Sequence, residues 1–344
     1  MTAPVAHLPE HAASWVRAAL GRDPLAETHS TCSTCALCEG GGDGRRPQGR
    51  VTTTAQVKCC TYRPALPNYL VGAILSDQEQ GSEFGHQSVR TRMTDWPAEL
   101  SPLGLFPAVS DPAFLGASKE ACPHLDEGKC GIWKHRHAVC STYFCKFERG
   151  ASGQKAWLAL RAMLLAVERS LALWCCVEEG MPPAALSLVA AHSESVPGVT
   201  LHPSDSMASL WGDRGSDPEA FFRSCHARVK DLSWDQVISA TGPAVRALAA
   251  AAKAEFDGLQ GPIPNRLKPG RYAVTATSGD GVLAETYSAM DPIGLPMLLL
   301  SVLHVFDGRE LDVVRQELQE QHGLGLDGDF LRALVDFRVL VAAD

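Results

Sequence analysis

The stretch CPHLDEGKCGIWKHRHAVCSTYFC, from Cys122 to Cys145, sets four cysteines within 24 residues, with His124, His135 and His137 among them. Cysteines clustered this densely, in a chain that shows no secretory signal, are typical of zinc or iron–sulfur sites. We therefore expect this stretch to organise a metal-binding region. The spacing leaves open whether any of the three histidines is also a ligand.

A second group of cysteines lies upstream, as CSTCALC and VKCC. A Cys-x-x-Cys turn lets two thiolates converge on one metal, and four thiolates complete a zinc site or an iron–sulfur cluster. The two groups together predict nine metal ligands: Cys32, Cys35, Cys38, Cys59, Cys60, Cys122, Cys130, Cys140 and Cys145. Nine thiols allow two complete sites with one thiol left over, or one site with spare thiols beside it.

The other three cysteines, Cys175, Cys176 and Cys225, stand in segments that read as helices. Reduced cysteine behaves as a small apolar side chain when it is buried. We expect these three to belong to the core and not to the metal site.

Composition restricts the class of protein. The chain has 344 residues, 45% of them hydrophobic, and a formal net charge of −8. The acidic balance gives no reason to expect nucleic acid, and no segment reads as a signal peptide or a membrane span. We expect a cytoplasmic protein whose twelve cysteines stay reduced. In a secreted protein the same number would read as six disulfides.

The predicted fold is mainly α with a cysteine-rich metal-binding loop region. Residues 1–258 form a mostly helical domain, with the cysteine core at 30–150. Helical segments are predicted at 9–20, 65–75, 84–93, 154–178 and 233–258, the last one broken at Gly242-Pro243.

A linker rich in proline and glycine, residues 259–270, precedes a C-terminal module at 271–344. Two short β-type runs flank SGDG, which is typical of a hairpin. Helices are predicted at 294–306, 309–321 and 327–336, before a short strand in RVLVA. This order favours a small α+β, winged-helix-like module. From Asp291 onward it carries four arginines against ten acidic residues, which argues against DNA as its ligand.

The motifs Cys122-Pro-His-Leu and Cys130-Gly-Ile-Trp-Lys-His-Arg, followed by Cys140, resemble those of the YkgJ-type cysteine-cluster family, which is described as zinc- or iron-chelating. The upstream cysteines of that family map to Cys32, Cys35 and Cys38, with the paired cysteines displaced to Cys59-Cys60. His137 stands where the family usually has proline. The resemblance covers about residues 30–150 and implies metal or iron–sulfur binding.

The C-terminal module resembles PqqD-type peptide-recognition domains, chiefly over DPIGLPMLLLSVLHVFDGRE. That resemblance implies a peptide or protein partner that adds a strand to the edge of a sheet. The alternative is a plain winged helix that packs against the first domain.

These observations predict a cytosolic metal- or iron–sulfur-binding protein, an accessory or redox partner in peptide or protein modification. The alternative is a non-enzymatic interaction protein with a structural zinc site. The chain contains no Gly-rich phosphate loop, no G-x-S-x-G and no H-E-x-x-H. No catalytic residue is therefore assigned, and enzymatic activity stays open.

Overall fold

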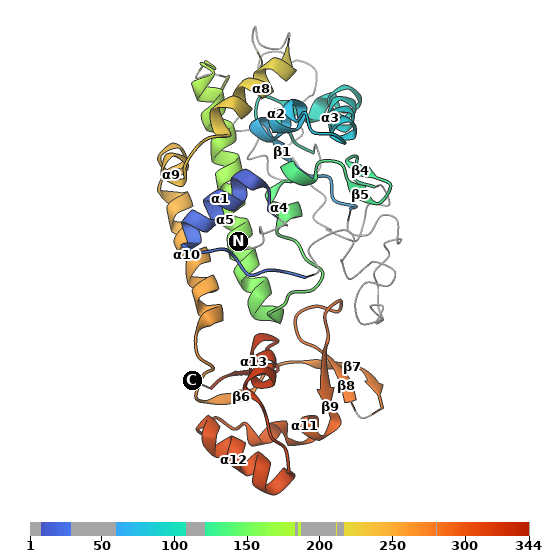
Figure 1. Ribbon diagram of the computed structural model, residues 1–344, viewed down its shortest axis with the longest axis vertical. Helices are drawn as coiled ribbons and strands as arrows, with labels where there is room; N and C mark the ends of the chain where they lie inside the picture. The colour runs from blue at the N-terminus through green and yellow to red at the C-terminus, as the bar shows by residue number, and fades with distance from the viewer. Residues whose placement is uncertain are drawn as a thin grey trace. The chain divides into compact units, whose positions relative to one another are not determined.

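A computed structural model describes residues 8–28, 60–107, 121–182, 185–186, 211, 217–279 and 281–343. The chain divides into two compact units, each built from several segments. Unit 1 comprises Met1–Pro24, Val51–Tyr143 and Leu160–Ala251, and unit 2 comprises Leu25–Arg50, Phe144–Ala159 and Ala252–Asp344. Unit 2 therefore takes in segments that the sequence prediction placed in the first domain. The described part of the chain is mainly α, as predicted, with several small sheets (Figure 1).

Helices dominate the part of the chain before residue 261. They are α1 Glu10–Leu20, α2 Asn68–Ser76, α3 Glu83–Asp95, α4 Ala138–Ser141, α5 Gly150–Glu178, α8 Pro218–Val229, α9 Trp234–Thr241 and α10 Pro243–Gln260. The predicted break between α9 and α10 is confirmed at Gly242-Pro243. Ser233 and Gln236 form a capping box that starts α9, which satisfies backbone N–H groups that the first turn leaves without partners.

The core of unit 1 is built around α2, eight of whose nine residues are buried. Helix α8 crosses α2 so closely that a Cβ atom on Gly72 would lie 1.8 Å from the carbonyl oxygen of Phe222. Only glycine allows this approach of two backbones. The crossing fixes α2, from whose end the chain leads into α3.

Short strands and 3₁₀ turns connect the helices of unit 1. The bounds are β1 Leu66–Pro67, β2 Leu100–Ser101, β3 Gly104–Leu105, β4 Leu125–Asp126, β5 Lys129–Cys130, η1 Pro97–Glu99 and η2 Trp133–His135. Strands β1, β3 and β2 form one antiparallel sheet in that order, and β4 pairs with β5. Strands of two residues are too short to show an alternating pattern, and none of them was predicted from the sequence.

The C-terminal part of unit 2 contains β6 Leu267–Pro269, β7 Ala273–Ser278, β8 Gly281–Glu285, β9 Ile293–Pro296, α11 Met297–Val302, η4 Leu303–Val305, α12 Leu311–His322, α13 Gly328–Asp336 and β10 Leu340–Ala342. Strands β7, β8 and β9 form an antiparallel sheet, and β10 pairs with β6. The hairpin at SGDG and the three helices are confirmed. The first helix begins at Met297 and not at residue 294, because Ile293–Pro296 pairs with β8. The winged-helix reading and the peptide partner of this module stay predictions.

Unit 2 also buries two carboxyl groups beside the start of α5. Glu27 accepts hydrogen bonds from the indole Nε1 of Trp157, at 2.7 Å, and from the backbone N of Glu148, at 2.8 Å. Asp291 accepts from the backbone N of Phe147, at 3.3 Å, and from the hydroxyl of Tyr287. These carboxyls bind the N–H groups that precede a helix, where negative charge is favoured. Burial is also the main reason why the pKa of Glu27 rises to about 7.

Within the described residues, no helix combines the length and the apolar character that a membrane crossing needs.

Candidate metal centre

The structure describes five of the nine predicted ligands. Cys60, Cys122, Cys130 and Cys140 belong to unit 1, and Cys145 belongs to unit 2. Cys32, Cys35, Cys38 and Cys59 lie outside the described residues. The candidate site is therefore built from the cysteines of unit 1 and the residues around them.

A backbone hydrogen bond joins the two cysteine groups. The N–H of Cys122 donates to the carbonyl oxygen of Cys60 over 2.7 Å, although 62 positions separate the two residues. Both side chains are half-buried. Cysteines that lie in separate groups of the sequence are therefore side by side in the fold, joined by a backbone hydrogen bond.

Cys130 lies in the β4–β5 hairpin, opposite Leu125. The two turn residues, Glu127 and Gly128, have φ values of 44° and 78°, as the two-residue turns that suit hairpins require. Gly131, which follows Cys130, donates its N–H to the carbonyl of His124 at 2.8 Å.

Glycine also brings this hairpin against α3. A Cβ atom on Gly85 would lie 2.7 Å from the carbonyl oxygen of Gly131. The hairpin backbone therefore packs directly on the first turn of α3. This contact brings the segment that contains His124 within reach of side chains on α3.

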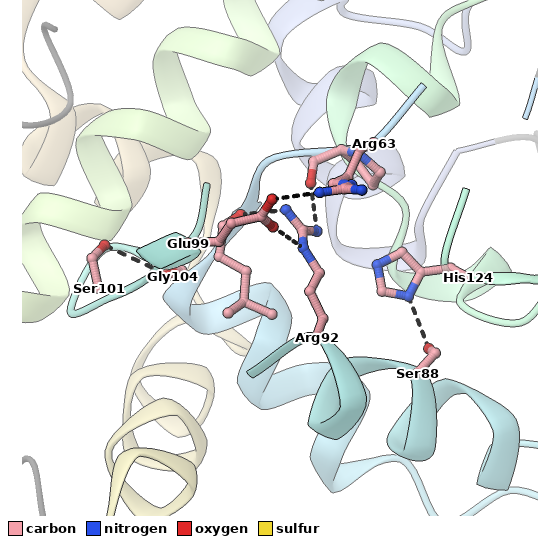
Figure 2. A network of polar contacts seen from close by, with 9 residues as sticks. Arg63, Ser88, Arg92, Glu99, Ser101, Gly104 and His124 are labelled. Carbon is pink, nitrogen blue, oxygen red and sulfur yellow. Dashed lines mark hydrogen bonds and ion pairs between the residues drawn. The ribbon is translucent and has the colours of Figure 1, made fainter. Parts of the chain in front are cut away.

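A buried arginine, Arg92 on α3, lies beside this segment with no exposed surface. Its guanidinium donates to Glu99 Oε2 at 2.7 Å, to the Pro64 carbonyl at 2.6 Å and to the Leu105 carbonyl at 3.2 Å. Glu99 also accepts from Arg63 NH1 at 2.8 Å, so one carboxylate bridges two guanidinium groups. Figure 2 shows this network next to His124.

Arg92 acts electrostatically on Cys122. Burial lowers the pKa of Arg92, while the charges of Glu99 and Cys122 act in the opposite direction. Because a Coulomb interaction works on both partners, the guanidinium favours the thiolate form of Cys122. Thiolate is the form of cysteine that binds metal.

Cys140, on the short helix α4, has a comparable neighbour in Arg161. That side chain donates to the hydroxyl and to the carbonyl of Thr142, each at 2.9 Å. Burial lowers the pKa of Arg161, whereas Cys140 is among the groups that raise it. Burial and then Cys140 also raise the pKa of Tyr62 to about 12. Arg161 therefore favours the thiolate of Cys140 as Arg92 favours that of Cys122.

The three histidines of the stretch differ in their surroundings. His137 Nδ1 accepts from the backbone N of Val139 at 3.3 Å, and its Nε2 lies 2.9 Å from Glu168 Oε2. His135 Nε2 lies 3.1 Å from Asp77 Oδ2. Both side chains thus have polar partners within the protein.

His124 is 1% exposed and has a polar partner at one ring nitrogen. Its Nδ1 lies 2.8 Å from the hydroxyl of Ser88 on α3, whereas its buried Nε2 has no hydrogen-bond partner among the described residues. Burial, and then the charge of Arg92, lower the pKa of His124 to about 3. The imidazole is therefore neutral at physiological pH.

No group of three or more His, Cys, Asp or Glu side chains within the described residues is arranged to hold a metal ion. Two thiols of this region, Cys122 and Cys140, interact electrostatically with the buried Arg92 and the partly buried Arg161, and the neutral imidazole of His124 buries a nitrogen that no described residue hydrogen-bonds. Thiolate and neutral imidazole are the ligands that zinc and iron–sulfur centres take.

The remaining cysteines, Cys175, Cys176 and Cys225, are fully buried in the core of unit 1. The thiol of Cys175 approaches the Cys225 carbonyl at 3.8 Å, and that of Cys176 approaches the Pro102 carbonyl at 3.4 Å. Their expected burial is confirmed.

Sequence reasoning missed Ser88 and Arg92, both on the helix predicted at 84–93. Arg90 stands two positions from Arg92 on the same helix, and its side chain is 50% exposed. The sequence gives no signal that tells these two arginines apart, because the difference arises from packing against β3 and η1.

Comparison of the chain with protein-family models, curated proteins and solved structures finds no significant match. The YkgJ-type and PqqD-type resemblances therefore stay predictions.

Proposed function

We propose that this chain binds a transition metal, as zinc or as an iron–sulfur cluster, through thiolates from both of its cysteine groups. The observation that carries the proposal is the 2.7 Å hydrogen bond from the Cys122 N–H to the Cys60 carbonyl. It makes neighbours of two groups that the sequence alone keeps apart. One centre can then draw ligands from both groups, and the nine thiols suffice for one or two centres.

Two electrostatic interactions also support thiolate ligands. The buried Arg92 interacts with Cys122, and the partly buried Arg161 interacts with Cys140. A thiolate-rich centre carries negative charge, which cations held within the protein offset. The two arginines therefore support Cys122 and Cys140 as ligands.

The two forms of the centre imply different roles. A redox-active iron–sulfur cluster would supply electron transfer, which suits an accessory or redox partner in peptide or protein modification in the cytosol. Zinc would supply structural stability alone, as in an interaction protein. His124 Nε2 is buried and has no hydrogen-bond partner among the described residues. This nitrogen supports zinc as the alternative, because structural zinc sites commonly combine cysteine and histidine ligands.

Anaerobic purification of the full chain tests the proposal. The same sample is analysed for iron, zinc and acid-labile sulfide, and its visible spectrum is recorded. Iron with matching sulfide and a broad band near ~400 nm identifies a cluster, and zinc in a colourless protein identifies the alternative. A chain that holds neither metal contradicts the proposal.

Cysteine variants assign the ligands in that preparation. We expect Cys122→Ser and Cys140→Ser to lower the metal content, because serine oxygen is a poor substitute for thiolate at either metal. Cys225→Ser and Cys175→Ala are the matched controls, since both thiols are buried in the apolar core of unit 1. Loss of metal in the controls, with full metal in Cys122→Ser, would reverse the assignment.

A further inference from the structure

We infer that His124 is a ligand of this metal centre and binds the metal through Nε2. The inference rests on the proposed function and deepens it, because it adds a nitrogen to a set of ligands that the sequence motifs describe as thiols. It follows from the hydrogen bonds of one serine, from burial, and from the position of Cys122.

We assign the tautomer of His124 from the hydrogen bonds of Ser88. The Ser88 hydroxyl donates to the Gly85 carbonyl at 2.9 Å, and the same oxygen lies 2.8 Å from His124 Nδ1. With the hydroxyl proton on the Gly85 carbonyl, we place the imidazole proton on Nδ1, so that Nε2 presents a lone pair. Figure 2 shows the ring fixed to α3 by this contact.

The lone pair at Nε2 is buried without a donor. The side chain is 1% exposed, and no described residue offers Nε2 a hydrogen bond. Nearly all buried polar atoms in folded proteins have a partner, because an unsatisfied one costs stability. A metal ion satisfies such a nitrogen, and ligand histidines commonly donate their other N–H to a fixed acceptor in the way that His124 donates to Ser88.

Cys122 lies two residues before His124, in the same turn. This turn closes from the Leu125 N–H to the Cys122 carbonyl at 3.0 Å and encloses His124. One turn of the chain therefore carries both a proposed thiolate ligand and the nitrogen of His124.

His135 and His137 lack this arrangement. Asp77 lies 3.1 Å from His135 Nε2, and the two nitrogens of His137 face the Val139 N–H and Glu168. A metal at either histidine would first have to displace these partners. Among the three histidines of the stretch, His124 alone combines burial with a ring nitrogen to which no described residue forms a hydrogen bond.

The test compares the wild-type chain with His124→Asn, both purified anaerobically with their metal. Asparagine places an amide N–H near the position of Nδ1, so the contact with Ser88 can persist while Nε2 is lost. X-ray absorption spectra, recorded at the absorption edge of the bound metal, should show a nitrogen ligand in the wild type. For zinc, we expect this nitrogen at about 2.0–2.1 Å, beside sulfur at about 2.3 Å. For a reduced iron–sulfur cluster, pulsed EPR should show coupling to one ¹⁴N nucleus.

We expect His124→Asn to lose the nitrogen signal and to release its metal to a chelator at least ~10-fold faster, as losses around metal ligands typically do. His135→Asn is the matched control and should keep both properties of the wild type. Should His124→Asn fail to fold, His124→Cys supplies a sulfur ligand in place of nitrogen. It should keep the metal and lose the nitrogen signal.

The outcomes separate this inference from the proposed function. A wild-type chain without metal contradicts the proposed function, and the inference with it. A wild-type chain whose metal has only sulfur ligands, and whose release rate His124→Asn leaves unchanged, overturns the role of His124 while metal binding by the cysteines stands. A nitrogen signal that survives His124→Cys and disappears in His135→Asn assigns the ligand to His135.

Discussion

A buried guanidinium in unit 1 and two buried carboxyl groups in unit 2 are stabilised differently. Unit 1 buries the guanidinium of Arg92, which Glu99 pairs with and which lies beside Cys122. Unit 2 buries the carboxyl groups of Glu27 and Asp291, which accept hydrogen bonds from uncharged N–H and O–H groups.

This difference separates a charge that is permanent from one that titrates. Arginine keeps its proton even when it is buried, so its charge must be met by an anion such as Glu99 or a cysteine thiolate. A buried carboxyl can instead take up a proton, and the raised pKa of Glu27 shows that tendency. Glu99 therefore meets the charge of Arg92, and we propose that the Cys122 thiolate adds to it, whereas the carboxyls of unit 2 have uncharged donors.

The largest effect should come from removal of the buried cation. Arg92→Met leaves Glu99 buried with fewer partners and leaves the Pro64 and Leu105 carbonyls without their donor. Breaking a buried ion pair from one side typically costs about 3–5 kcal/mol of the free energy of unfolding. Urea denaturation of the metal-free variant measures the loss.

Arg90→Met is the matched control on the same helix. Arg90 pairs with Glu219 at 2.7 Å, but its side chain is 50% exposed, and exposed pairs contribute about 0–1 kcal/mol. The double variant Arg92→Met with Glu99→Gln should recover part of the loss, because it leaves no carboxylate buried without Arg92; the side chain of Arg63, the other partner of Glu99, is 29% exposed and can be hydrated. Equal losses in the Arg90 and Arg92 variants would remove the distinction between the two sites.

A smaller effect, and one that depends on pH, is expected in unit 2. Burial raises the pKa of Glu27 from 4.5 to about 7, so between these values the folded chain binds more protons than the unfolded chain. The free energy of unfolding therefore falls as pH rises from about 4.5 to 7, by as much as ~3 kcal/mol from this group. Hydrogen bonds from the Glu148 N–H and from Trp157 lower the pKa of Glu27, and the charges of Glu148 and Asp291 raise it further.

Glu27→Gln should remove that slope, because glutamine does not titrate. The measurement is the free energy of unfolding at several pH values from 5 to 8, with wild type and variant side by side. Glu10→Gln, at an exposed position on α1, should leave the profile unchanged. A slope that persists in Glu27→Gln would show that another group of the chain binds the proton.

Local sequence signals predicted the helices better than the sheets. The alanine-rich run at α10 and the Gly242-Pro243 break identify helices from neighbouring residues alone. Strands β6 and β9 were missed because three and four residues are too short for an alternating pattern. Leu295 is part of an apolar run that is equally compatible with a helix, and its pairing with Val282 makes this segment a strand.

The candidate site was predictable only as far as residue type allowed. Cysteine spacing predicts which thiols are candidate metal ligands, but the hydrogen bond between Cys60 and Cys122 depends on tertiary structure. The three histidines look alike in sequence. What distinguishes His124 is Ser88, which is 36 positions away and reaches it because the hairpin backbone packs on Gly85. No pattern within the stretch from Cys122 to Cys145 contains that information.

The smallest expected effect tests whether neutral donors suffice for the carboxyls of unit 2. Tyr287→Phe removes the hydroxyl that donates to Asp291 and leaves the Phe147 N–H in place. We expect a loss of about 1.5 kcal/mol in the free energy of unfolding, typical of one hydrogen bond to a charged group.

Tyr272→Phe, in the same unit and partly buried against its core, is the control and should cost less. A loss in Tyr287→Phe as large as that in Arg92→Met would mean that Asp291 depends on one donor as strongly as Glu99 depends on its cation. The contrast between the units would then lie in the sign of the buried charge and not in how it is stabilised. A loss near 1.5 kcal/mol keeps both differences, because several weak donors then share the carboxyls that unit 2 buries.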